Sequence, residues 1–125
     1  MTLRPLAAAL IAGAILTGCQ TNEIDVDSSA DLRGAQLFEE RCSGCHTLEA
    51  ASSQGSKPDG EVSGGERTNG PNFETRKVSA DDVLFAIRNG GFSGATMPAN
   101  IVVGEEAQAV AEFLEKYSGQ GSTGN

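Results

Sequence analysis

Three segments of the chain, residues 31–41, 79–89 and 105–117, carry their apolar residues at helical spacing. The apolar faces consist of Gly34 and Phe38 in the first segment, Val83, Leu84 and Ile87 in the second, and Ala107, Val110, Leu114 and Tyr117 in the third. A glycine inside a helix costs roughly 1 kcal/mol, so Gly34 indicates a close crossing with another helix. The pattern predicts three helices that pack against one another.

The polar segments between and around these helices predict loops. Ser79 is suited to capping the second helix, and the pair Gly90-Gly91 to ending it. Residues 52–70 are rich in Ser and Gly without a packing pattern, which predicts a mobile loop. Residues 19–30 read as a flexible tether and residues 119–125 as a flexible tail, so that one folded domain remains over residues 31–118.

Residues 1–18 have the features of an export segment. Arg4 precedes an apolar run over residues 6–16, which is shorter than the about 20 residues needed to cross a bilayer. Leu16-Thr17-Gly18-Cys19 resembles the lipobox of bacterial lipoproteins, which implies that Cys19 becomes a lipidated N-terminus. Cleavage elsewhere, which leaves Cys19 a free thiol, and a retained membrane anchor are the alternatives.

Composition narrows the function further. Nine basic and seventeen acidic residues give a net charge of −8, which excludes an unassisted nucleic-acid binder because phosphate contacts need clustered Lys and Arg. Aromatic residues make up only 5% of the chain, and a domain this small has little room for an apolar core. Such a domain is commonly stabilised by disulfides, a metal or a bulky cofactor.

The remaining two cysteines lie in Cys42-Ser43-Gly44-Cys45-His46, the Cys-x-x-Cys-His motif that attaches c-type haem. Two thiols at this spacing form thioethers with the vinyl groups of one haem, and the adjacent imidazole binds its iron. A redox-active disulfide and a zinc site are the alternatives. No βαβ pattern surrounds the motif, and three ligands fall short of the four of a structural zinc site.

The second axial ligand is predicted to be Met97. His46 is the only histidine, and Met97 is the only methionine after residues 1–18. A thioether favours ferrous iron, and His/Met ligation raises the reduction potential. Pro98 stiffens the loop that presents the sulfur. A packing role for Met97, with a lysine such as Lys57 on the iron, is the alternative.

The sequence resembles the class I c-type cytochromes over residues 31–118. Gly34 and Phe38 precede Cys42 with the spacing of that family's N-terminal helix, and the resemblance implies that Leu114 and Tyr117 pack across them. It also implies an all-α domain wrapped around one covalent haem, with N- and C-terminal helices crossing. Asn69-Gly70-Pro71-Asn72 resembles the family's Gly-Pro turn, which implies a hydrogen bond from the haem-ligating histidine to the carbonyl of Pro71.

The chain departs from the family in two respects. The stretch between His46 and Pro71 is longer than usual, and the tryptophan that some relatives use to bind a haem propionate is absent. The basic residues that offer a replacement are Arg67, Arg76, Lys77 and Arg88.

Together these features predict an exported electron carrier rather than an enzyme. We expect it to be lipid-anchored on the outer face of the cytoplasmic membrane or in the periplasm, with the outer membrane left open by Gln20 after the lipidated cysteine. Its partners would be other redox proteins. The acidic surface either steers the domain to basic docking surfaces on them or only keeps the tethered domain soluble. A small peroxidase-like haem enzyme and a gas or redox sensor with a labile sixth ligand are the alternative functions.

Overall fold

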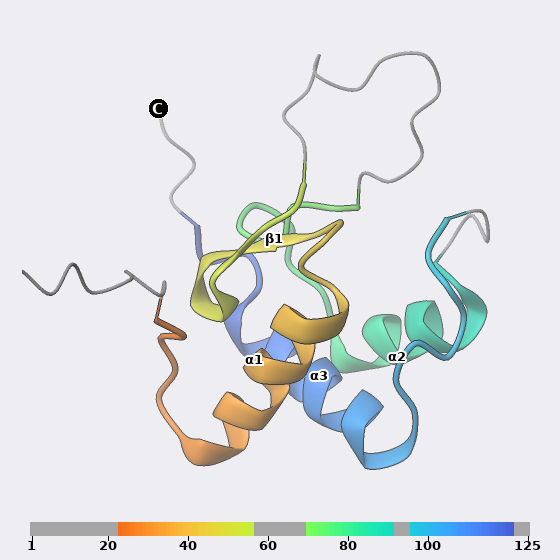
Figure 1. The fold of residues 1–125 in the computed structure, drawn as a ribbon, viewed down its shortest axis with the longest axis horizontal. Coiled ribbons are helices and arrows are strands. Elements are labelled where there is room, and N and C mark those ends of the chain that lie inside the picture. Colours follow the sequence, from red (N-terminus) through yellow and green to blue (C-terminus); the bar gives the residue numbers. More distant parts are fainter. Residues whose placement is uncertain (1–22, 57–69, 92–95, 122–125) are drawn as a thin grey trace, which may run out of the picture.

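The computed structural model describes residues 23–56, 70–91 and 96–121 of the 125-residue chain. It contains three helices, α1 (Ser29–Arg41), α2 (Ala80–Asn89) and α3 (Gly104–Tyr117), which lie close to the predicted segments (Figure 1). The predicted all-α class is therefore confirmed. None of the helices in these described ranges is long and apolar enough to cross a bilayer.

A small hairpin was not predicted. Strands β1 (Thr47–Leu48) and β2 (Ser53–Gln54) pair antiparallel around a single 3-10 turn, η1 (Glu49–Ala51). Ser52 follows that turn with a φ of 55°, and the buried hydroxyl of Ser53 donates to the carbonyl of His46. The hairpin thus occupies the start of the predicted 52–70 loop and lies against the Cys-x-x-Cys-His motif. Residues 57–69 of that loop lie outside the described residues.

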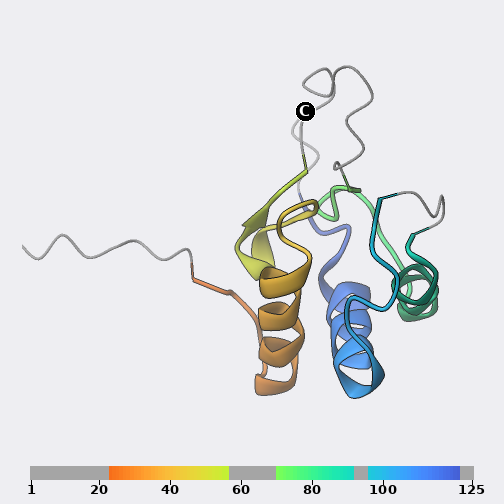
Figure 2. The ribbon, with the colours of Figure 1, turned by 45° about the vertical axis from the view of Figure 1, so that its right-hand side comes forward.

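Helices α1 and α3 cross at Gly34, and Figure 2 shows the two side by side. A Cβ on Gly34 would lie 2.4 Å from the carbonyl oxygen of Ala109 and 2.5 Å from the Cβ of Phe113, so only glycine fits there. The predicted close crossing is confirmed. Ala109 and Phe113 approach Gly34 most closely, Leu114 lines a cavity together with Phe38, and the Tyr117 ring contacts that of Phe113.

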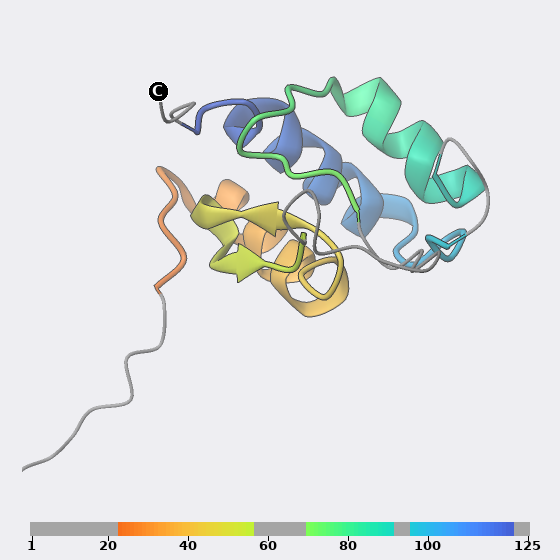
Figure 3. The same cartoon turned by 90° about the horizontal axis from the view of Figure 1, so that it is seen from above.

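Helix α2 packs against α3 on the side away from α1, as the view from above shows (Figure 3). The Ser79 hydroxyl accepts a hydrogen bond from the amide of Asp82 at 3.2 Å, which is the predicted N-cap. Gly90 ends the helix with a φ of 77°, a left-handed conformation that favours glycine. Val83 and Ile87 are buried by this packing.

The segment before α1 is bound to the domain, where the sequence suggested a flexible tether reaching to residue 30. The amide of Asp25 donates to the carbonyl of Ala50 at 3.2 Å, and that of Asp27 donates to the Tyr117 hydroxyl at 2.8 Å. Ile24 and Val26 pack against the core between these bonds. Alternating apolar and acidic residues therefore place an extended strap along the domain rather than a free linker.

Lys116, near the end of α3, connects this strap to α1. Its ammonium group lies 2.7 Å from a carboxylate oxygen of Asp31 and 3.1 Å from one of Asp27. The hydrogen bond from Lys116, followed by that from Ser28, lowers the pKa of Asp31 below its ordinary value of 3.8. A group whose pKa is lower in the folded state stabilises the protein above the unfolded pKa, and this contribution is lost as pH falls.

We predict that Asp31→Asn in the haem-loaded protein lowers the melting temperature by a few degrees at pH 7, the range of a partly exposed ion pair. The difference from wild type should narrow as the pH falls below 3.8, where the wild-type carboxylate also becomes protonated. Thermal unfolding followed by circular dichroism measures both values. Glu39→Gln, an exposed charge on the same helix, is the control and should change little. A difference in melting temperature between Asp31→Asn and wild type that stays constant with pH would contradict the lowered pKa of Asp31.

Candidate functional site

The residues of the Cys-x-x-Cys-His motif lie in the turn that ends α1. The amides of Cys42 and Ser43 donate to the carbonyl of Phe38 at 2.8 and 3.1 Å. The amides of Cys45 and His46 both donate to the carbonyl of Cys42 at 3.1 Å. These bonds wind the chain into a compact turn in which Cys42, Cys45 and His46 are all half-buried. The motif is therefore presented from the rigid end of a packed helix.

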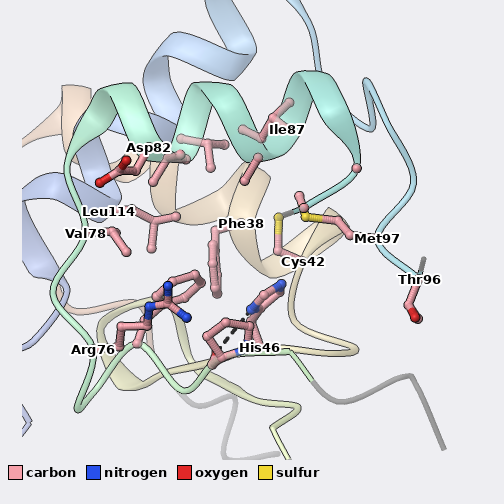
Figure 4. A pocket seen from close by; sticks show the side chains of 17 residues that line it. Phe38, Cys42, His46, Arg76, Val78, Asp82, Ile87, Thr96, Met97 and Leu114 are labelled. Carbon is pink, nitrogen blue, oxygen red and sulfur yellow. Dashed lines mark hydrogen bonds between the residues drawn. The ribbon is translucent and has the colours of Figure 1, made fainter. Parts of the chain in front are cut away.

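A cavity of about 560 Å³ adjoins this turn and is lined by residues of all three helices. Most of the lining side chains are apolar; they include Phe38, Phe73, Val78, Val83, Ile87, Val110 and Leu114. Figure 4 shows Cys42, His46 and Met97 gathered at one end and Arg76 and Asp82 at the other. A smaller pocket of about 110 Å³ shares Cys42, His46 and Met97 with the cavity and is also lined by Cys45. The structure thus brings the sequence-predicted residues to one place.

The orientation of the His46 ring is set by a hydrogen bond. Its Nδ1 lies 3.1 Å from the carbonyl oxygen of Pro71. Because a carbonyl can only accept, Nδ1 carries the proton and Nε2 keeps a free lone pair. Burial lowers the pKa of His46, although the hydrogen bond to Pro71 raises it. The net lowering favours the neutral imidazole, which is the form that binds a metal.

Met97 lines the same cavity from the loop that follows α2. The amide of Asn100 donates to the carbonyl of Ile87 at 2.7 Å, which attaches this loop to the helix. At Gly90 a Cβ would lie 2.7 Å from the carbonyl oxygen of Met97, so the glycine permits a close approach as well as a left-handed φ. The half-buried Met97 is consequently held near the end of α2.

The electrostatics of Cys42 distinguish between the interpretations of the motif. Burial, and to a smaller extent the neighbouring Cys45, raises the pKa of the Cys42 thiol to about 11. Redox-active Cys-x-x-Cys pairs instead have a thiol whose pKa is lowered, because the thiolate is the reactive form. In the described part of the chain Cys42 and Cys45 are both free of disulfides. A neutral thiol in an apolar wall does not support the redox-disulfide alternative.

The basic residues considered as partners of a haem propionate lie in different places relative to the cavity. Arg76 lines the cavity. Lys77 donates to a backbone carbonyl of α3, and Arg88 is exposed on α2 outside the cavity lining. Arg67 and Lys57 lie outside the described residues. Of the basic residues that the structure describes, Arg76 is therefore the one suited to a negatively charged group at the far end of the cavity.

Some predicted features cannot be placed. Cys19 and the whole export segment lie outside the described residues.

Two contacts of His46 were not anticipated from the sequence. The Phe73 ring stacks on the imidazole with centroids 4.9 Å apart and planes 16° from parallel. A Cβ on Gly70 would lie 2.5 Å from Cε1 of His46, so this position requires glycine. The sequence offered a weak indication for both, since they flank Pro71 in one short segment.

The described residues fit a covalently attached haem. The cavity has the size and apolar lining of a cofactor site. Its lining supplies an imidazole with a free Nε2, a thioether and a neutral thiol, with the second thiol in the adjoining pocket. Imidazole and thioether are common axial ligands of haem iron, and both thiols belong to one haem-attachment motif.

Comparison with known proteins agrees with this chemistry. Residues 29–114 match the family model described as cytochrome C oxidase, cbb3-type, subunit III. The crystal structure of the c-type cytochrome SorU from Sinorhizobium meliloti is 30% identical in sequence, with a TM-score of 0.52. The similarity covers 74% of this chain and 94% of SorU. The search of curated proteins found no match.

The fold and the site define a c-type cytochrome domain, and the chain belongs to the cbb3-type cytochrome c family. It is an electron-transfer protein with covalently bound haem c, and the expected cytochrome c-like helical fold is confirmed. The family indicates an electron carrier rather than an enzyme, and c-type cytochromes of this kind are exported to the periplasm.

Proposed function

We propose that this protein is a lipid-anchored monohaem cytochrome that transfers single electrons between other redox proteins. Cys42 and Cys45 attach the haem, and His46 and Met97 bind its iron. The observation that carries this proposal is the His46 ring, whose Nδ1 is bound to Pro71 while its side chain lines the same cavity as Met97. Bound haem iron supplies a one-electron couple, with a potential that depends on its axial ligands.

The protein's own residues have three tasks in this function. The apolar walls exclude water, which keeps the environment of the iron constant between oxidation states. Pro71 holds the proton of His46 on Nδ1, so that the same nitrogen faces the iron throughout. Arg76, which lines the other end of the cavity, would compensate the charge of a haem propionate. A His-assisted peroxidase site is not available within this chain, because His46 is its only histidine.

We predict that Met97→Ala lowers the midpoint potential by on the order of 100 mV or more, since axial ligands span about 0.8 V among haem proteins. The weak band near 695 nm expected for oxidised Met–iron ligation should disappear, and the ferrous protein should bind CO. Potentiometry and absorption spectroscopy measure these changes. Ile101→Ala, which trims a half-buried neighbour lining the small pocket, should retain both band and potential. An unchanged spectrum in Met97→Ala would assign the ligand to another residue, such as Lys57.

The proposed anchor is Cys19, from which lipid chains would hold the domain at a membrane surface. This fits the family, since c-type cytochromes of this kind are exported to the periplasm. Lipidation places the domain on the outer face of the cytoplasmic membrane or on the outer membrane.

We predict that the wild-type protein sediments with membranes and that Cys19→Ser is released into the soluble exported fraction. A mass spectrum of the wild-type protein should show the chain from Cys19 onward with one haem and added acyl chains. Spectra of the two proteins should be identical, because the anchor lies outside the haem domain. A wild-type chain without acyl mass, or one cleaved at another residue, would contradict lipidation of Cys19.

The proposed partners are membrane-bound or exported redox proteins with basic docking surfaces. Support comes from the net charge of −8, which would steer this acidic domain toward positive charge over a long range.

We predict that the rate of reduction by a donor co-purified with the native lipoprotein falls at least tenfold between about 10 mM and 1 M salt, as the screening length falls from about 30 to 3 Å. Stopped-flow absorption measures the rate. An uncharged small-molecule reductant provides the control and should show little salt dependence. A salt-independent rate with the protein donor would remove electrostatic steering but leave electron transfer intact.

A further inference from the structure

One face of the His46 ring is covered by Phe73. The two ring centroids are 4.9 Å apart and the planes are 16° from parallel, an offset-stacking distance for aromatic rings. Phe73 is buried, with 8% of its surface exposed, and lines the large cavity together with His46. The contact therefore joins a buried ring to a half-buried one and directly adjoins the proposed haem site.

The backbone holds Phe73 in place independently of its ring. The amide of Phe73 donates to the carbonyl of Thr47 at 2.9 Å, and its own carbonyl accepts from the amide of Gly119 at 2.7 Å. Three residues earlier the amide of Gly70 donates to the carbonyl of Cys45 at 2.7 Å. Segment 70–73 is thus bonded on both sides of His46, to the residues directly before and after it.

A single hydrogen bond leaves an imidazole one free rotation. The bond from Nδ1 to Pro71 fixes the position of one ring atom, but the ring plane can still turn about that contact. Stacking removes this freedom, because rotation would drive the imidazole edge into the flat face beside it. Phe38 is the other aromatic neighbour, but its ring is 6.2 Å away and tilted by 54°, so it does not form a second stack. It instead meets Phe73 nearly edge-on at 6.0 Å and lies beside both rings, at almost the same distance from each.

We propose that Phe73 is a positioning residue for the axial histidine: its stacked ring fixes the plane of the His46 imidazole and keeps Nδ1–H on the carbonyl of Pro71. This inference rests on the proposed role of His46 as an iron ligand. Gly70 contributes by allowing the segment to approach, since a side chain there would collide with the same imidazole.

The test uses the reduced, haem-loaded protein with ¹⁵N-labelled histidine. His46 is the only histidine in the chain, so its Nδ1–H resonance is unambiguous. In Phe73→Leu, which keeps an apolar side chain but removes the flat ring, we expect this proton to exchange with solvent faster by roughly two- to tenfold, the factor that an aromatic pair contributes to an equilibrium. Electron paramagnetic resonance of the oxidised protein should show changed g values, because these depend on the orientation of the axial imidazole. Phe73→Met should give the same result, and Phe73→Tyr should restore the wild-type values.

The matched control is Phe113→Leu. Phe113 is also buried and contacts Phe38, but the cavity lining does not include it. Phe113→Leu should lower the melting temperature without changing the exchange rate of the His46 Nδ1 proton or the g values. The proposal is overturned if Phe73→Leu and Phe73→Met leave both readouts unchanged, or if Phe113→Leu shifts them equally. Failure of the underlying ligand assignment looks different: the His46 ring resonances of the wild-type protein would then lack the large upfield displacement that a haem ring current causes.

Discussion

The site depends on one nitrogen of His46 being occupied by Pro71. That bond decides the tautomer, and the tautomer decides which nitrogen is left to meet a metal. It also joins two parts of the chain that are 25 residues apart in the sequence. The hairpin contributes from another direction, since Ser53 donates to the carbonyl of His46 itself. Side chain and backbone of this residue are thus both held by contacts outside the Cys-x-x-Cys-His motif.

The helices and the ligand candidates could be predicted from the sequence because their determinants are local. The cap at Ser79 and the glycine at position 90 act within one turn of the helix they limit, and the structure contains both. The attachment motif is equally local, and composition reduced the choice of a second ligand to Met97 and a few lysines. The roles of these ligands stay predictions, although the structure collects them around one cavity.

Features that depend on distant residues were harder to predict. Two-residue strands have no periodicity to detect, so the hairpin of β1 and β2 left no pattern in the sequence. The close approach at Gly34 was expected, but the α3 residues nearest to it, Ala109 and Phe113, were not identified, because periodicity identifies a face and not the register of a crossing. The stack between Phe73 and His46 depends on how segment 70–73 pairs with the motif, which a single sequence does not reveal. The strap over residues 23–28 was taken for a linker because its carboxylates outweigh its two apolar residues in composition.

The strap changes the reach of a domain attached at Cys19. Among the described residues, its first backbone bond to the domain is at Asp25, six residues beyond that cysteine, and a fully extended chain of this length measures at most about 20 Å. A linker free up to the start of the predicted helix at residue 31 would reach about twice as far. A cytochrome with so short a linker to its lipid anchor would sample only a thin layer above the lipid headgroups. Electron donors and acceptors whose redox centres stand higher than this layer would be beyond its range, so height above the bilayer would select partners before any surface complementarity does.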